Sequence, residues 1–529
     1  MMKISTLISI AILSGAVTEL SAQQGLAIAV APSKMPKLAT VDPRFVSYNV
    51  EMVEVTGGRF WKPYKSAATA LAPSPPSQAG QQVGIDPTRF QYRPPIDLAN
   101  PRLRKLAAAL GPSYLRVSGS WANSTYFQDD ERPALAEPPK GFRGVLTRAE
   151  WKGVIDFARA VDDQIVTSFA ISSGTRDADG VWTPAQARAL LDYTKSIGGN
   201  IPATEFMNEP TFPGPGGAPA GYNAAVFAKD AKLFGAFLRK ESPQTIYLGP
   251  GSVGGVGEGP PSRRSSGAGV GIGLIGSEDI LKGTGPIFDA FSYHFYGGVS
   301  RRCGGNTSPE KALAAEWLDF SGAVADYYTK LRDEYLPGKP LWLTETAEAA
   351  CGGDPLARQF VDTFRYLNQL GSLAQKGVRS IMHNTLASSD YGLLDEDTLE
   401  PMPDYWAALF WKRTMGNVVL DPGVPKNQSL RIYAHCSING KGGVSLLVLN
   451  TDTEYEKVLI LPSPAEEFSL TASELTSTTV LLNGTVLKAE PDGSVGPLKG
   501  DAVKNGPVRL PPSSVTFLAI SSAQNKSCM

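Results

Sequence analysis

The feature that most constrains the fold of this 529-residue chain is an alternation of β-type and helical segments between residues 45 and 416. Runs rich in Val, Ile, Tyr and Phe are each followed by a stretch whose apolar residues have helical spacing. Such alternation predicts parallel strands joined by crossover helices, and about eight units predict an α/β fold closed as a (β/α)8 TIM barrel. An open, doubly wound sheet is the alternative. The β-type runs are residues 45–55, 113–117, 164–171, 203–210, 245–248, 288–296, 341–346 and 378–384.

The sequence changes character after Gly416. Short β-rich runs are separated by turn signals, among them Asn483-Gly484, a pair typical of a type I′ hairpin. This pattern predicts an attached C-terminal β-sandwich domain over residues 417–529. Residues 23–44 contain an early strand-like run that we expect to join the sandwich, which leaves residues 45–416 as the barrel domain.

The first 22 residues have the composition of a secretory signal peptide. Lys3 precedes an uncharged apolar run at residues 4–17, and the small residues Ser21 and Ala22 end the segment. We therefore expect a secreted, extracellular protein, with a buried N-terminal helix as the alternative. No later stretch reaches the roughly 18 apolar residues of a membrane span.

The cysteines and the net charge narrow the class of protein. The spacing of the four cysteines matches no zinc-site pattern, so two disulfides are the better interpretation. The four cysteines are Cys303, Cys351, Cys436 and Cys528.

A net charge of −1 gives the protein no overall positive potential that would attract nucleic acid. We expect a monomer without cofactor or metal. Glycosylation sequons, which matter only in a host that glycosylates, lie at Asn123, Asn306, Asn427, Asn483 and Asn525.

Two glutamates follow β-type runs in matching places. Asn208-Glu209-Pro210 ends one run, and Glu345 lies at the end of another. Two carboxylates at the ends of barrel strands are the minimum equipment for hydrolysing a glycosidic bond with retention of configuration. Glu209 suits the acid/base role, because the Asn208 amide can hold a sugar hydroxyl beside the leaving oxygen. Glu345 suits the nucleophile.

Further polar residues lie at the predicted strand ends. His294 and Tyr296 alternate on one run and therefore face the same side, from which the tyrosine hydroxyl can keep Glu345 ionised. Glu51, Arg116 and His383 occupy equivalent ends on other strands. Taken singly, such residues are also typical of turns, surface acids and buried histidines. Their combination on strands four, six and seven predicts catalysis, with Arg116, Asn208, His294 and Tyr296 lining the substrate site.

Four longer motifs stand out, at residues 112–120, 207–210, 341–346 and 391–406. Through these motifs the chain, from about Phe45 to the C-terminus, resembles glycoside hydrolase family 79, which contains heparanases and β-glucuronidases. The resemblance implies a retaining enzyme with Glu209 as acid/base and Glu345 as nucleophile. It also implies that Glu51 and Ser120 contact hydroxyls in the −1 subsite and that Tyr391 meets a substrate carboxylate.

The resemblance bears on the disulfides as well. Heparanase-like members tie the sandwich to the C-terminus with a disulfide, and Cys436 and Cys528 stand in those places. The remaining pair, Cys303 and Cys351, would then join the loop after strand six to the loop after Glu345. Such a link would stiffen the rim of the pocket.

The chain departs from the family pattern around the sugar site. His383-Asn384 stands where the family has Arg-Gln, and Ser388-Ser389-Asp390 stands where glycines often precede the tyrosine. Asp390 would repel a uronate unless it points away. Retaining hydrolysis of a glucuronide is the first hypothesis, a β-glycosidase for a neutral or modified sugar is the second, and an inactive saccharide-binding homologue is the third. Basic residues near the expected cleft are Arg263, Arg264, Arg301 and Arg302.

Overall fold

A computed structural model describes residues 27–64, 86–214, 216–254, 259, 274–425, 427 and 429–529. The expected signal peptide at residues 1–22 lies outside the described residues. So do Arg263, Arg264 and most of the Pro- and Ser-rich segment before Phe90.

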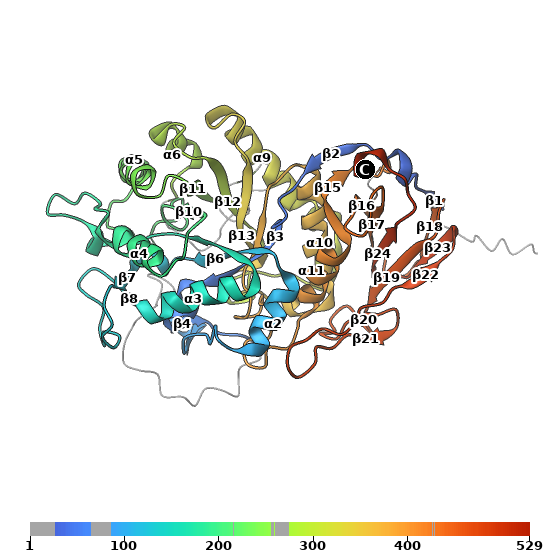
Figure 1. Ribbon diagram of the computed structural model, residues 1–529, viewed down its shortest axis with the longest axis horizontal. Helices are drawn as coiled ribbons and strands as arrows, with labels where there is room; N and C mark the ends of the chain where they lie inside the picture. Colours follow the sequence, from blue (N-terminus) through green and yellow to red (C-terminus); the bar gives the residue numbers. More distant parts are fainter. Residues whose placement is uncertain are drawn as a thin grey trace, which may run out of the picture.

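Eight parallel strands close into a barrel, which confirms the TIM-barrel prediction and excludes the open sheet (Figure 1). The strands follow one another around the barrel in chain order, and the last pairs with the first. They are β3 (Val46–Glu51), β6 (Ser113–Ser118), β9 (Asp163–Thr167), β10 (Ala203–Glu205), β11 (Ile246–Gly254), β12 (Ala290–Val299), β13 (Leu341–Ala350) and β14 (Ile381–His383).

Helices cover the outside of the barrel, and polar caps mark where several of them begin. The Asn100 side chain accepts hydrogen bonds from two amides of α2, and Thr147 forms a capping box with Glu150 at the start of α3. The helices are α1 (Met52–Thr56), α2 (Pro101–Leu110), α3 (Arg148–Val161), α4 (Ala185–Ser196), α5 (Ala224–Glu241), α6 (Ser277–Thr284), α7 (Pro309–Leu313), α8 (Ala315–Leu318), α9 (Phe320–Tyr335), α10 (Phe360–Gln375) and α11 (Pro403–Thr414).

Continuous helical spacing predicts a single helix from Ser308 towards Tyr335, and this prediction is wrong, because α7, α8 and α9 divide that stretch. Ala314 adopts an extended conformation between α7 and α8. The Asn368 side chain donates a hydrogen bond to the Leu318 carbonyl at 2.6 Å, at the end of α8. Tertiary partners of this kind override the continuous helical spacing of the sequence.

The C-terminal region forms a β-sandwich of two sheets, and the N-terminal segment adds a strand to each. β1 (Ile28–Ala29) pairs in parallel with β18, and β2 (Lys37–Thr40) pairs antiparallel with β15. The small sheet is β1, β18 (Lys457–Leu461) and β23 (Gly506–Leu510). The large sheet is β2, β15 (Met415–Leu420), β16 (Leu430–Ser437), β17 (Val444–Asn450), β24 (Ser514–Ile520), β19 (Ala465–Thr471), β20 (Leu481–Leu482), β21 (Thr485–Val486) and β22 (Asp501–Val503).

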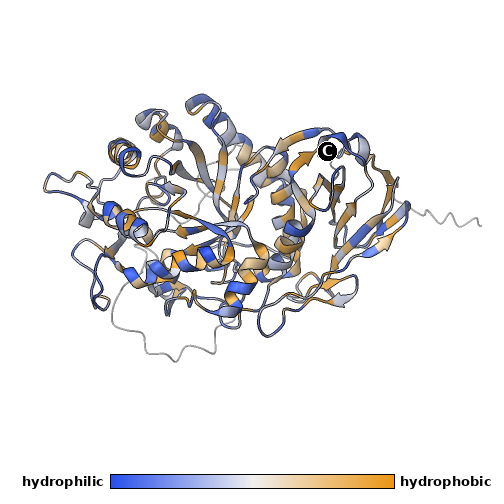
Figure 2. Cartoon of the chain, viewed as in Figure 1, coloured by the Kyte–Doolittle hydropathy of each residue, from blue (hydrophilic) through white to orange (hydrophobic). Residues whose placement is uncertain are grey.

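Helices α10 and α11 lie between the barrel and the sandwich (Figure 1). The Phe410 ring of α11 lies 5.6 Å from Phe468 and 6.0 Å from Phe517 of the large sheet, measured between ring centroids. Gly371 of α10 packs so closely on the Tyr433 ring that a Cβ would come within 2.3 Å of it. Apolar residues are concentrated on the strands and on the helix faces turned towards them (Figure 2). The large sheet therefore shares a hydrophobic core with the barrel helices, while a second core lies between the two sheets of the sandwich.

Two short ribbons lie outside the barrel: β4 (Gly58–Trp61) with β5 (Phe90–Arg93), and β7 (Thr125–Gln128) with β8 (Gly144–Thr147). The structure forms both disulfides that the resemblance pointed to, Cys303–Cys351 and Cys436–Cys528. Such bonds fit an oxidising compartment. Among the described helices, none is long and apolar enough to cross a membrane.

Candidate active site

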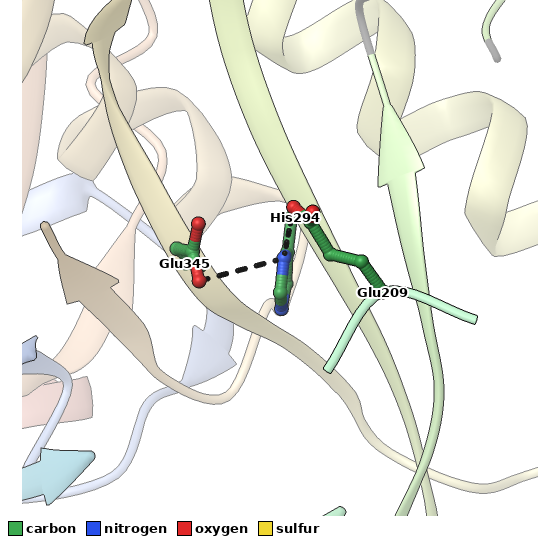
Figure 3. A group of neighbouring side chains, drawn as sticks. All are labelled: Glu209, His294 and Glu345. Atoms are coloured by element: carbon green, nitrogen blue, oxygen red, sulfur yellow. Dashed lines mark hydrogen bonds and ion pairs between the residues drawn. The ribbon is translucent and has the colours of Figure 1, made fainter. Parts of the chain in front are cut away.

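Glu209, His294 and Glu345 come together at the carboxyl ends of the barrel strands (Figure 3). Glu209 follows β10, and His294 pairs with Glu345 in the register of β12 and β13. One carboxylate oxygen of each glutamate and one ring nitrogen of His294 all lie within 4.8 Å of one another. His294 Nδ1 is 3.0 Å from Glu209 Oε1 and 3.7 Å from Glu345 Oε2, so the imidazole lies between the two carboxylates.

Both oxygens of Glu345 accept hydrogen bonds. The Tyr296 hydroxyl donates to Oε1 at 2.6 Å, and Arg116 Nη1 donates to Oε2 at 2.9 Å. Tyr296 and His294 come from the same face of β12, as the alternation of a strand requires. These bonds hold the Glu345 carboxylate in one orientation and stabilise its ionised form.

Arg116 lies beneath the carboxylates, which differs from the substrate-binding role expected for it. Its side chain is fully buried, and Nη2 donates to Asn208 Oδ1 at 2.7 Å and to Glu205 Oε2 at 2.9 Å. With its donors directed at these side chains and at Glu345, Arg116 positions the site and does not present a group to a ligand.

Glu205 was missed by the sequence analysis. It lies on β10, is 1% exposed, and accepts two hydrogen bonds from Arg116 and a third from the Thr344 hydroxyl at 2.8 Å. Nothing in its local sequence distinguishes it from an ordinary strand residue.

The pKa values of Glu209 and Glu345 are shifted in opposite directions. Burial raises the pKa of Glu209 above its ordinary value, and the charge of Glu345 raises it further, against the hydrogen bond with His294. Burial alone would raise the pKa of Glu345 too, but His294, Arg116 and the Tyr296 hydroxyl together hold that pKa below its ordinary value. One carboxyl group is thus set to keep its proton and the other to lose it.

The remaining predicted site residues line one side of this group. Glu51 ends β3, and its Oε2 has no hydrogen-bond partner among the described residues. Gly119 makes room for it, since a Cβ there would come within 1.4 Å of that oxygen. Ser120 Oγ lies 3.5 Å from Asn208 Nδ2. Burial raises the pKa of Glu51 well above its ordinary value, with a further contribution from Glu345.

Asn384 connects Tyr296, which bonds Glu345, to Tyr391. Its Nδ2 donates to the Tyr296 hydroxyl at 3.2 Å and to the Tyr391 hydroxyl at 3.3 Å. His383 points elsewhere: its Nε2 donates to the Tyr391 carbonyl at 2.7 Å, and its ring packs on Tyr366. The structure therefore brings Asn384 and Tyr391 to the site but leaves His383 supporting the loop behind them.

Asp390 is neutralised within the rim of the site. Its buried carboxylate accepts a hydrogen bond from Arg302 Nη2 at 2.6 Å and another from the Tyr64 amide. The Arg302 guanidinium also lies over the Tyr64 ring, 4.3 Å from its centroid. The Cys303–Cys351 bond fixes the loop that carries Arg302 to the end of β13, and Arg302 in turn holds Asp390, in the loop after β14, by an ion pair.

Glu209, His294 and Glu345 offer the kinds of atom that bind a divalent cation. The Arg116 guanidinium already lies 2.9 Å from Glu345 Oε2 and 3.2 Å from His294 Nε2, and it would repel a second cation at this point. We therefore interpret the three residues as two carboxyl groups with opposite pKa shifts and an imidazole that lies between them.

Comparisons with known proteins show which glycosidases the chain is similar to. No protein-family model matches the chain. Mouse heparanase is 28% identical over 498 residues, which cover 82% of this chain and 88% of that protein. The hyaluronoglucuronidase of Hirudo nipponia is 26% identical over 483 residues, covering 82% and 92%.

The fold also matches solved structures. A 4-O-α-L-rhamnosyl-β-D-glucuronidase from Fusarium oxysporum superposes with a TM-score of 0.62 at 12% identity. The match covers 93% of this chain and 100% of the other. At that identity the likeness concerns the fold alone. The chain is a glycoside hydrolase, and over both modules it is similar to heparanase-like proteins of family 79.

Proposed function

We propose that this glycoside hydrolase cleaves β-linked glucuronides with retention of configuration, using Glu209 as acid/base and Glu345 as nucleophile. The observation that carries the proposal is that two carboxyl groups, both in contact with His294, have pKa values shifted in opposite directions. Retaining enzymes hold their carboxyl groups about 5–5.5 Å apart, whereas inverting enzymes leave roughly 6.5–9.5 Å for a water. The limit of 4.8 Å between the functional atoms supports the retaining arrangement.

In the first step the ionised Glu345 attacks the anomeric carbon, and Glu209 gives its proton to the leaving oxygen. Burial lowers the pKa of His294, but the charge of Glu345 and the hydrogen bond with Glu209 raise it above its ordinary value. Nδ1–H then donates to Glu209 Oε1, and the transferable proton lies on the other oxygen. In the second step Glu209 takes a proton from water, which hydrolyses the glycosyl–enzyme ester.

Three observations support glucuronic acid as the sugar. Two of the relatives are a heparanase and a hyaluronoglucuronidase. The Tyr391 hydroxyl is available beside Asn384 for a sugar carboxylate, and the charge of Asp390 is balanced by Arg302. The raised pKa of Glu51 favours a neutral carboxyl group, which lowers the repulsion that a uronate would meet.

The test compares p-nitrophenyl β-glucuronide with the matching β-glucoside, and follows the anomer first released by NMR. We expect the glucuronide to be cleaved with retention and Glu345→Gln to abolish turnover without loss of folding. Hydrolysis of the glucoside alone would exclude the uronate, and full activity of Glu345→Gln would exclude the mechanism. A wild-type protein that binds both compounds and cleaves neither would favour the saccharide-binding alternative.

Secretion and the monomeric state belong to the same proposal. The sequence of residues 1–22 and the two disulfides support export. N-terminal sequencing of protein from the medium is expected to begin at Gln23, and light scattering is expected to give the mass of one chain.

A further inference from the structure

Asn123, which the sequence presents as a glycosylation sequon, binds the backbone of the residue next to Glu209. Its Oδ1 accepts a hydrogen bond from the Asn208 amide at 2.8 Å, and its Nδ2 donates to the Asn208 carbonyl at 2.9 Å. Because one partner only donates and the other only accepts, the orientation of the side-chain amide is determined. The side chain is completely buried, so the nitrogen that a glycan would occupy is already bonded.

This contact is made where the barrel itself offers no support. β10 ends at Glu205, so Asn208 and Glu209 lie beyond the ladder of the sheet. Glu209 has a φ of 50°, a left-handed conformation that a non-glycine residue adopts only when its surroundings impose it. A backbone under such strain relaxes when the groups that hold it are removed.

Asn123 is itself held in place by neighbouring loops. Its carbonyl accepts hydrogen bonds from the amides of Ile171 and Ser172, at 2.9 and 3.1 Å, in the loop after β9. Gly216 packs against its amide, since a Cβ there would lie 2.7 Å from Nδ2. Asn123 follows β6, so it links the loops after three consecutive barrel strands, β6, β9 and β10.

We infer that Asn123 is a positioning residue for the acid/base: by binding both backbone groups of Asn208, it holds the left-handed Glu209 in line with the leaving oxygen. The inference rests on the proposed function, in which Glu209 protonates that oxygen. Its role differs from that of His294, which bonds the Glu209 carboxylate directly.

A series of aryl β-glucuronides with leaving groups of different pKa separates this role from general destabilisation. A good leaving group such as 2,4-dinitrophenolate departs without protonation, whereas phenolate needs the acid. The value measured is kcat/KM, which reports the glycosylation step alone. For Asn123→Ala we expect a loss of about 10²-fold with the phenyl compound, the scale of a small misplacement of a catalytic group. With the dinitrophenyl compound we expect kcat/KM to change by less than about 3-fold, because general acid help is not needed.

Asn123→Asp provides a second variant of the same shape, which keeps the acceptor for the Asn208 amide and loses the donor to its carbonyl. It is expected to show the same dependence on the leaving group.

Asn525→Ala is the matched control. Asn525 is another buried sequon asparagine, and its Nδ2 donates to the carbonyls of Pro32 and Met35 in the sandwich, far from the barrel tips. It is expected to lower the thermal midpoint of unfolding and to leave the leaving-group dependence unchanged.

Equal losses of kcat/KM with the phenyl and dinitrophenyl compounds, in Asn123 variants that still fold, would overturn the inference and leave the proposed function intact. If the wild-type protein cleaved none of the series, the proposed function would fail and the inference with it. Mass spectrometry of protein from a glycosylating host adds an independent readout. Active enzyme is expected to carry no glycan at Asn123, and a glycan there in fully active enzyme would also overturn the inference.

Discussion

Replacing Tyr296 with phenylalanine removes one hydroxyl from the candidate site and nothing else. The hydroxyl donates to Glu345 Oε1 at 2.6 Å, both side chains are buried, and the bond favours the ionised form of Glu345. A hydrogen bond to a charged group contributes about 1.5–3 kcal/mol, and each pKa unit corresponds to about 1.36 kcal/mol. Tyr296→Phe should therefore raise the pKa of Glu345 by about 1–2 units.

The direction in which the pH profile of kcat/KM shifts depends on the protonation state that each carboxyl group must have to react. Glu345 must be ionised, so the wild-type acidic limb of kcat/KM should lie below the ordinary range of a glutamate, in keeping with its lowered pKa. The alkaline limb should lie above that range, because Glu209 must be protonated and its pKa is raised. In Tyr296→Phe the acidic limb should move upward, the alkaline limb should stay, and the plateau should fall by about 10–10²-fold.

Tyr293→Phe is the matched control for this experiment. Tyr293 lies on the same strand and is equally buried, but it faces the other side, and its hydroxyl has no hydrogen-bond partner among the described residues. Its removal should leave both limbs in place. An acidic limb that does not move in Tyr296→Phe, or that moves equally in both variants, would refute the electrostatic account of Glu345.

Two further substitutions test the surroundings of the site. Gly119→Ala would bring a Cβ within 1.4 Å of Glu51 Oε2 at a φ of 88°, so kcat/KM should fall by about 10²-fold as Glu51 is displaced. Gly153→Ala, in an open position of α3, should leave kcat/KM unchanged, and an equal loss there would contradict the steric cause. Arg302→Gln would leave the buried Asp390 without its cation and should lower the free energy of unfolding by about 3–5 kcal/mol in a urea titration. Adding Asp390→Asn should restore most of that stability, and a double variant as unstable as the single one would show that the charge pair is not the cause.

Much of the fold could be predicted because it depends on local patterns. The alternation of β-type runs and helical spacing repeats along the barrel, and each unit carries its own start and stop signals. The errors lie where partners distant in sequence decide the outcome. The break between α7, α8 and α9 is one, and β15, β22 and β23, which the sequence did not reveal as strands, are others.

The candidate site likewise contains residues that could be predicted from the sequence and residues that could not. Glu209 and Glu345 were recognisable because two carboxylates at the ends of predicted barrel strands are typical of a retaining glycosidase. Glu205 was not recognisable, because its importance comes from Arg116, on a strand 89 residues away in sequence. The positioning role inferred for Asn123 could not be predicted for a related reason: the sequon describes three consecutive residues, whereas the partner of the Asn123 side chain is the backbone of Asn208.

The sequence by itself determined the fold class and the two carboxylates, since both follow from periodicity and from the ends of predicted strands. Only the tertiary structure decided what charge each carboxylate carries and how it is held. The pKa of Glu209 and that of Glu345 differ because one lacks and the other has a hydroxyl and a guanidinium within hydrogen-bonding distance. Those donors come from β6 and β12, and burial in a closed barrel makes their effect strong. Electrostatic interactions depend on distances between groups in the folded protein, and the order of residues along the chain does not specify those distances.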